Sequence, residues 1–174
     1  IRDIGVTGVQ TCALPISPGS PLAILADPPL RKPWPSCAYT HRAIEAALRI
    51  AGAPRFDAAR ITAIVIRMPE PYARVVAIAR PKTPAQARFS ATYCVAATLA
   101  TGSLGPDDFA TPMLHRPDVV ALAARCVLDA YPLAPGIGDM SPAAPDSLRV
   151  EFADGRREEV TIGDVLGGAA RPLD

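Results

Sequence analysis

Apolar residues recur at helical spacing in the stretch Ser36–Ile50. The spacing of three and four residues predicts a helix that ends at Gly52. Ser36 and Thr40 are both candidate N-caps, because a side-chain oxygen at either position can accept a hydrogen bond from the first helical turn. The apolar positions that carry this pattern are Ile44, Ala47 and Leu48.

A second helical pattern opens at Thr83 and is the strongest in the chain. Pro84 occupies the first helical position and Gln86 the third, which is a capping box with a proline start. The apolar pattern then runs to Gly102, a natural C-terminal stop. A further helix is predicted over Asp118–Arg125.

The clearest strand is Arg60–Met68, which is rich in β-branched residues. Both of its faces are largely apolar, so we expect a central strand covered on both sides. Leu148–Ile162 predicts a β-hairpin whose turn is Asp154-Gly155. Shorter candidate strands are Leu22–Ala26 (an edge strand), Tyr72–Ile78 and Cys126–Asp129. Strands and helices alternate without a strict βαβ rhythm, so the predicted class is α+β, with helices on a small mixed or antiparallel sheet.

Composition narrows the possible partners. Apolar residues make up 49% of the chain and charged residues 20%, which is typical of a globular domain. A net charge of +1 gives no positive electrostatic potential strong enough to attract nucleic acid or an anionic membrane. No apolar run is long enough to span a membrane. We therefore expect neither a nucleic-acid partner nor a membrane.

The spacing of the cysteines argues against a structural zinc site and against a disulfide framework. The cysteines are widely spaced and form no CxxC pair. The chain has only two histidines that could serve as further ligands, so a structural zinc site is not expected. A chain of this length holds together by burial and needs no disulfide framework. We interpret the cysteines as free thiols in a reducing compartment, by default the cytoplasm. They are Cys12, Cys37, Cys94 and Cys126.

The first sixteen residues do not read as part of a protein domain. Val6–Ile16 (VTGVQTCALPI) matches the conceptual translation of a common sequencing adapter, and Ile1–Asp3 fits the adapter's upstream part. We therefore expect residues 1–16 to be non-native and residues 17–174 to form the domain, with natural sequence missing before Ser17.

Candidate chemistry is concentrated in Lys32–His41. Two prolines stiffen the approach to the predicted helix start, and a helix start with a lysine beside it favours an anion. Cys37 and His41 are four residues apart and would share a helix face. A cation beside a titratable imidazole suits a carboxylate substrate that gains or loses a proton. The ordinary alternatives are a surface lysine and a small buried thiol, and residue chemistry alone leaves both possibilities open. His115, in a proline-rich loop, is interpreted as a solvated residue.

Four motifs, in this order, carry a family resemblance: KPWPSCAYTHRAIEAAL (32–48), PKTPAQARFSATYCVAATLATG (81–102), RPDVVALAARCVL (116–128), and GxxxxP at 167–172 after the hairpin. The chain resembles the C-terminal domain of the MmgE/PrpD family, which contains 2-methylcitrate dehydratase, cis-aconitate decarboxylase and an iminodisuccinate epimerase. The resemblance implies an α+β domain that encloses an active site together with an all-helical N-terminal domain, absent from this chain, in a homodimer.

The same resemblance implies roles for single residues. Lys32 would bind a substrate carboxylate, and Tyr93 would donate a hydrogen bond in the pocket. Cys37 takes the place of a catalytic histidine in the decarboxylase and of a glutamate in the best-known dehydratases, so the acid–base group differs there. His41 would be the titrating group.

The expected function is that of a metal-independent lyase, a dehydratase or decarboxylase, acting on a small di- or tricarboxylic acid such as 2-methylcitrate. No cofactor is expected, and the fragment alone is expected to be inactive, because further site residues of the family lie in the helical domain. The alternatives are an epimerase or isomerase of the same family, and a non-catalytic α+β module for dimerisation or ligand binding. Convergence of Lys32, Cys37, His41 and Tyr93 on one open face would favour the enzyme, and their dispersal would favour the module.

Overall fold

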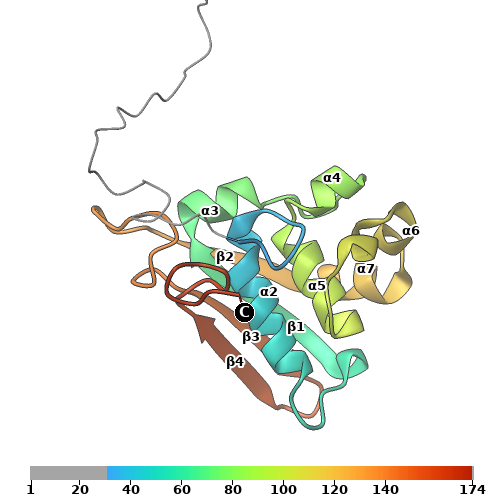
Figure 1. Cartoon of the computed structure of the whole chain (residues 1–174). Helices are drawn as coiled ribbons and strands as arrows, with labels where there is room; N and C mark the ends of the chain where they lie inside the picture. Colours follow the sequence, from blue (N-terminus) through green and yellow to red (C-terminus); the bar gives the residue numbers. More distant parts are fainter. Residues whose placement is uncertain (1–30, 174) are drawn as a thin grey trace, which may run out of the picture.

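The computed structural model describes residues 31–173 of the 174-residue chain (Figure 1). The adapter-like segment 1–16 and the predicted edge strand Leu22–Ala26 lie outside the described residues. Within residues 31–173 no helix has the length and apolarity needed to cross a membrane.

A four-stranded mixed sheet is the framework of the domain. Its strands are β1 (Ile61–Pro69), β2 (Cys126–Tyr131), β3 (Asp146–Phe152) and β4 (Arg157–Ile162), in the order β2-β1-β3-β4. β1 pairs with β2 in parallel, whereas β1–β3 and β3–β4 are antiparallel. The α+β class is confirmed, as is the hairpin of β3 and β4, whose Gly155 has the positive φ (82°) of its turn.

Helices cover one face of the sheet (Figure 1). α2 (His41–Ala51) packs on β3, β4 and α5 (Ala91–Thr101), and α5 also contacts β2. The buried side chains of the sheet that face these helices are Ile64, Ile66, Met68, Leu148 and Val150.

The other face of β1 is not covered by the described residues. Val65 is only half-buried and Arg67 is exposed, so the prediction of a strand covered on both sides is wrong, although β1 is central as predicted. The physical reason lies in the neighbouring strands, which bring charged residues to this face. The Arg67 guanidinium forms an ion pair with the Asp129 carboxylate at 2.6 Å, and the Arg157 guanidinium forms one with the Glu151 carboxylate at 2.9 Å. Such pairs stay hydrated at little cost, whereas their burial would be expensive.

The predicted strand Tyr72–Ile78 is instead a helix, α3 (Glu70–Val75). A proline occupies its first turn, and an i,i+4 ion pair of 2.5 Å joins Arg74 to Glu70. Tyr72 and the C-cap residue Val76 are both buried and are four apart, which is helical spacing. The β-branched residues at the end of the helix are also typical of strands, which accounts for the wrong prediction.

The predicted helix from Thr83 to Gly102 is two helices. α4 (Pro84–Ala87) has the predicted cap, in which the Thr83 hydroxyl accepts from the Gln86 N–H, and then stops. α5 has its own cap, the Ser90 hydroxyl, which accepts from the Tyr93 N–H at 3.1 Å. Gly102 ends α5 in the left-handed region (φ 74°), as predicted.

The remaining elements complete the helical layer. α7 (Pro117–Ala123) corresponds to the helix predicted after residue 117, and β2 extends the predicted strand by two residues, to Tyr131. The short elements are η1 (Ala38–Thr40), η2 (Ala58–Arg60), η3 (Pro106–Phe109) and α6 (Thr111–Leu114).

Candidate functional site

The segment that precedes α2 has a tighter local structure than a simple helix start. Cys37 is extended (φ −60°, ψ 136°), and its N–H donates to the Arg88 carbonyl at 2.9 Å. The 3-10 turn η1 follows, and α2 begins only at His41. Cys37 therefore lies before the helix, and the expectation that it shares an α-helical face with His41 is wrong.

Neither predicted cap residue caps α2 with its side chain. The hydroxyls of Ser36 and Thr40 lie 2.8 Å apart, and the Thr40 hydroxyl donates to the Cys37 carbonyl at 2.8 Å. Both hydroxyls are buried and used within the turn. Local hydrogen bonds of this kind compete with helix capping, which explains the late start of α2.

His41 is wholly buried, with an exposure of 0%. The Trp34 ring meets it edge-on at 5.3 Å between centroids, and neither ring nitrogen has a partner of normal hydrogen-bond geometry among residues 31–173. Burial lowers the pKa of His41 to about 4, helped by the charge of Lys32 and opposed by the backbone of Ser36 and Trp34. The imidazole is therefore neutral at pH 7, which leaves it able to accept a proton from a stronger acid.

Lys32 is exposed and lies at the same end of α2 as His41. Its ammonium is 3.5 Å from the Ser36 carbonyl oxygen. Lys32, Cys37 and His41 thus lie in one short segment, in which Lys32 is exposed, Cys37 is half-buried and His41 is buried.

The C-terminal segment holds this region in place. The Arg31 N–H donates to the Gly167 carbonyl at 3.0 Å. Gly167 has a φ of +90°, and a Cβ there would lie 1.9 Å from the Arg31 carbonyl oxygen, so only glycine allows the two backbones to approach. Arg171 forms a two-pronged ion pair with Glu45 of α2, at 2.8 and 3.0 Å. Gly167 and Arg171 belong to the GxxxxP motif at 167–172, and Glu45 belongs to the motif at 32–48, but the sequence did not indicate that the two motifs meet.

Tyr93 belongs to α5 and is buried. Its hydroxyl donates to the Asp108 carbonyl, and its ring packs 6.0 Å from Phe109. Burial raises the pKa of Tyr93 to about 12, so the phenol keeps its proton. Its hydrogen atom is already used within the chain, which limits its capacity to donate to a substrate.

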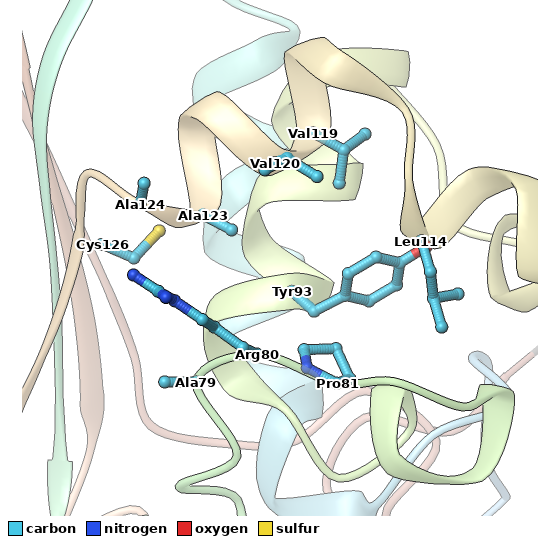
Figure 2. Close-up of a pocket in the computed structure, with 10 residues that line it drawn as sticks. All are labelled: Ala79, Arg80, Pro81, Tyr93, Leu114, Val119, Val120, Ala123, Ala124 and Cys126. Carbon is cyan, nitrogen blue, oxygen red and sulfur yellow. The ribbon is translucent and has the colours of Figure 1, made fainter.

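A cavity of about 470 Å³ adjoins Tyr93 (Figure 2). It lies between α5, α7 and residues 79–81, and Arg80 projects along it. Lys32, Cys37 and His41 are not among its lining residues. The four predicted site residues thus fall into two groups, and Arg80 was not predicted because its environment depends on contacts distant in sequence.

Residues 31–173 contain no group of three or more His, Cys, Asp or Glu side chains arranged to hold a metal ion. His115, at the end of α6, is exposed.

Comparison with known proteins places the chain in a family. The sequence profile described as the MmgE/PrpD C-terminal domain matches residues 34–174. A search of curated proteins finds no significant match. The matched region includes every element of the sheet and the helical layer, together with Cys37, His41 and Tyr93. The chain belongs to the MmgE/PrpD family and carries its C-terminal domain.

Proposed function

We propose that this domain forms one wall of the active site of a metal-independent lyase that acts on a small di- or tricarboxylic acid such as 2-methylcitrate. Family membership supports a parent enzyme, because MmgE/PrpD members are generally enzymes. The observation that carries the proposal is the neutral imidazole of His41, which has no hydrogen-bond partner of normal geometry among residues 31–173, at the same end of α2 as the exposed ammonium of Lys32.

The proposed chemistry begins with removal of a proton next to a carboxylate. The resulting enediolate-like charge needs a cation already in place, and Lys32 supplies it. His41, with Cys37 in the segment before it, accepts or returns the proton. In a dehydratase the β-hydroxyl then leaves as water, taking up the proton that His41 removed. In a decarboxylase no proton is removed first: carbon dioxide leaves from a carboxylate, and the carbanion that remains takes one proton delivered through His41. Tyr93 contributes a hydrogen bond in this scheme, after exchanging its present acceptor, the Asp108 carbonyl.

The proposal includes an all-helical domain of the same polypeptide that supplies the opposite wall, and a homodimer as the working unit. It requires no cofactor. The cytoplasm is the proposed compartment, since Cys37, Cys94 and Cys126 are free thiols.

The test is to recover the complete gene and assay the protein on 2-methylcitrate and cis-aconitate. We expect turnover of at least one acid by the complete protein and none by the 174-residue chain. Lys32→Met should lower kcat/KM about 10- to 100-fold, the typical effect of a lost charged hydrogen bond. His41→Gln should lower kcat about 100-fold or more, as for a lost general base.

Matched controls exist within the chain. Lys82→Met removes an exposed lysine and His115→Gln an exposed histidine, and both should leave activity unchanged. Full activity in the Lys32 and His41 variants would contradict the assigned roles. Inactivity on both acids would remove those two substrates.

A second candidate function is that of a non-catalytic module for dimerisation or ligand binding. A third candidate is an epimerase of the same family. The division of the predicted residues favours the module, because the cavity beside Tyr93 does not include Lys32, Cys37 or His41. Two results together would favour the module. The complete protein would show no activity on any small carboxylic acid, and light scattering would show a dimer that no longer forms when this domain is removed. An epimerase would exchange the α-proton of its substrate with deuterium from solvent and release neither water nor carbon dioxide.

A further inference from the structure

The cavity beside Tyr93 has the size and the walls of a small-molecule site. Its volume of about 470 Å³ falls within the range of about 300–1,000 Å³ that such sites occupy. Three alanines leave the space open where α7 and residues 79–81 face each other (Figure 2). They are Ala79, Ala123 and Ala124.

Most of the cavity wall is apolar. Leu114 and Val119 are buried beneath it, whereas Val120 remains 49% exposed, among the most exposed large apolar side chains described. The ring of Tyr93 completes this wall. Covering such surface stabilises a complex by roughly 25 cal/mol per Å², so a hydrocarbon group gains from binding here.

One solvent-exposed charge, with no carboxylate partner among the described residues, faces the cavity. The Arg80 guanidinium points along it toward Cys126, and the lining contains no Asp or Glu. Among residues 31–173 nothing forms a hydrogen bond, ion pair or aromatic contact with Arg80. Arg116, by contrast, is paired with Asp118 at 2.6 Å. A free guanidinium fork matches one carboxylate in two-pronged geometry.

The other polar groups of the lining are already satisfied. The Tyr93 hydroxyl donates to the Asp108 carbonyl, and the Cys126 thiol contacts the Leu122 carbonyl at 3.4 Å. Burial raises the pKa of Cys126 to about 12, so it is no nucleophile at neutral pH. The cavity is therefore equipped for binding one anionic group, not for covalent chemistry.

We propose that the cavity between α5 and α7 binds an amphiphilic monocarboxylate, with its carboxylate on Arg80 and its hydrocarbon part on Tyr93, Val119 and Val120. The site goes beyond the proposed lyase activity, because it needs neither Lys32 nor turnover. Tyr93 contributes only its ring to the wall.

The experiment is a titration of the 174-residue chain with octanoate, in which binding is measured by calorimetry and by ligand-observed NMR. Saturable binding is expected, and 1-octanol and octylammonium should bind about tenfold more weakly, because they lack the charge that Arg80 matches. Arg80→Met should weaken octanoate binding about tenfold and leave 1-octanol binding unchanged. The matched control is Arg74→Met, which removes an exposed arginine on α3.

A second pair of variants tests the apolar wall. Ala123→Leu fills the cavity and should abolish octanoate binding, whereas Ala121→Leu, on an exposed position of the same helix, should not. Circular dichroism confirms that each variant is folded. Three outcomes would overturn the proposal. They are the absence of saturable octanoate binding, an equal loss of octanoate affinity in Arg80→Met and Arg74→Met, and an equal loss of octanoate affinity in the two alanine variants. Because no step requires turnover, these results do not depend on the outcome of the lyase assay.

Discussion

The helices α2 and α5 are each 11 residues long and pack against each other, but they are stabilised in different ways. The polar groups of α5 bond within the helix or to segments close in sequence: Thr98 donates to the Cys94 carbonyl at 2.7 Å, Ser90 caps the first turn, and the Tyr93 hydroxyl donates to the Asp108 carbonyl. The buried polar groups of α2 bond to segments about a hundred residues away. We therefore expect α5 to tolerate loss of a polar group, whereas α2 depends on partners remote in sequence.

Arg42 is the strongest instance of this dependence. It is wholly buried, and its guanidinium donates to the carbonyls of Met140, Ser141 and Ala144. Asp146 lies 3.8 Å from it and is also buried. Burial raises the pKa of Asp146 to about 7, with Arg42 opposing the shift. The loop that contains residues 140–144 is therefore tied to the start of α2 by one side chain.

The largest expected effect follows from removing that side chain. Arg42→Met should lower the free energy of unfolding by about 3–5 kcal/mol at pH 8, where Asp146 is ionised and would be buried without a counter-charge. Urea unfolding measures this loss, which should be smaller at pH 6 because Asp146 is then largely protonated. Thr98→Val, the α5 counterpart, should cost about 1 kcal/mol or less. Equal losses in the two variants would contradict the comparison.

Local signals in the sequence predicted much of the fold. The turn at Gly155 and the stop at Gly102 need a positive φ, which the residue itself allows, and the β-branched run of β1 needs no distant partner to be recognised. The break between α4 and α5 could not be predicted from local signals of this kind. It depends on the Ala91 N–H, which donates to the Val76 carbonyl at 3.0 Å across the chain.

The candidate site divides in the same way. Lys32 and His41 are near in sequence, so their proximity was predictable. The burial of His41 depends on Trp34 packing over its ring, and the cavity at Tyr93 depends on how α7 meets residues 79–81. Neither arrangement leaves a periodic trace in the sequence, because both depend on tertiary packing.

An intermediate effect is expected where the C-terminal segment meets the residues before α2. Gly167→Ala would force a Cβ to within 1.9 Å of the Arg31 carbonyl oxygen and would strain a φ of +90°. We expect a loss of about 2–3 kcal/mol in urea unfolding, together with faster exchange of the Arg31 amide hydrogen. Gly136→Ala is the matched control, since Gly136 has a φ of +82° but no atom within 4 Å of the added Cβ.

That control separates strain from contact. Gly136→Ala should cost about 1 kcal/mol, the usual penalty for a left-handed alanine. If Gly167→Ala costs no more than Gly136→Ala, the backbone contact with Arg31 does not hold the residues before α2, and α2 is less dependent on remote partners than the comparison states.

The smallest expected effect concerns the unpaired imidazole at the start of α2. The pKa of His41 is lowered from 6.5 to about 4, so between these values the unfolded chain binds a proton that the folded chain does not. The contribution of His41 to stability is therefore present above pH 6.5 and is lost as the pH falls toward 4. Asp146, with its pKa raised to about 7, acts in the opposite direction over the same range. The two contributions partly cancel in the unmodified chain, so only a difference between variants isolates His41.

His41→Gln provides that difference. Relative to the unmodified chain, its free energy of unfolding should improve by about 1–2 kcal/mol when the pH is lowered from 7 to 5, since the proton-linked loss is absent. His115→Gln, at an exposed position, should follow the unmodified chain at both pH values. A His41→Gln variant that also follows it would mean that the imidazole is paired or hydrated in solution, and α2 would then resemble α5 in satisfying its polar groups locally.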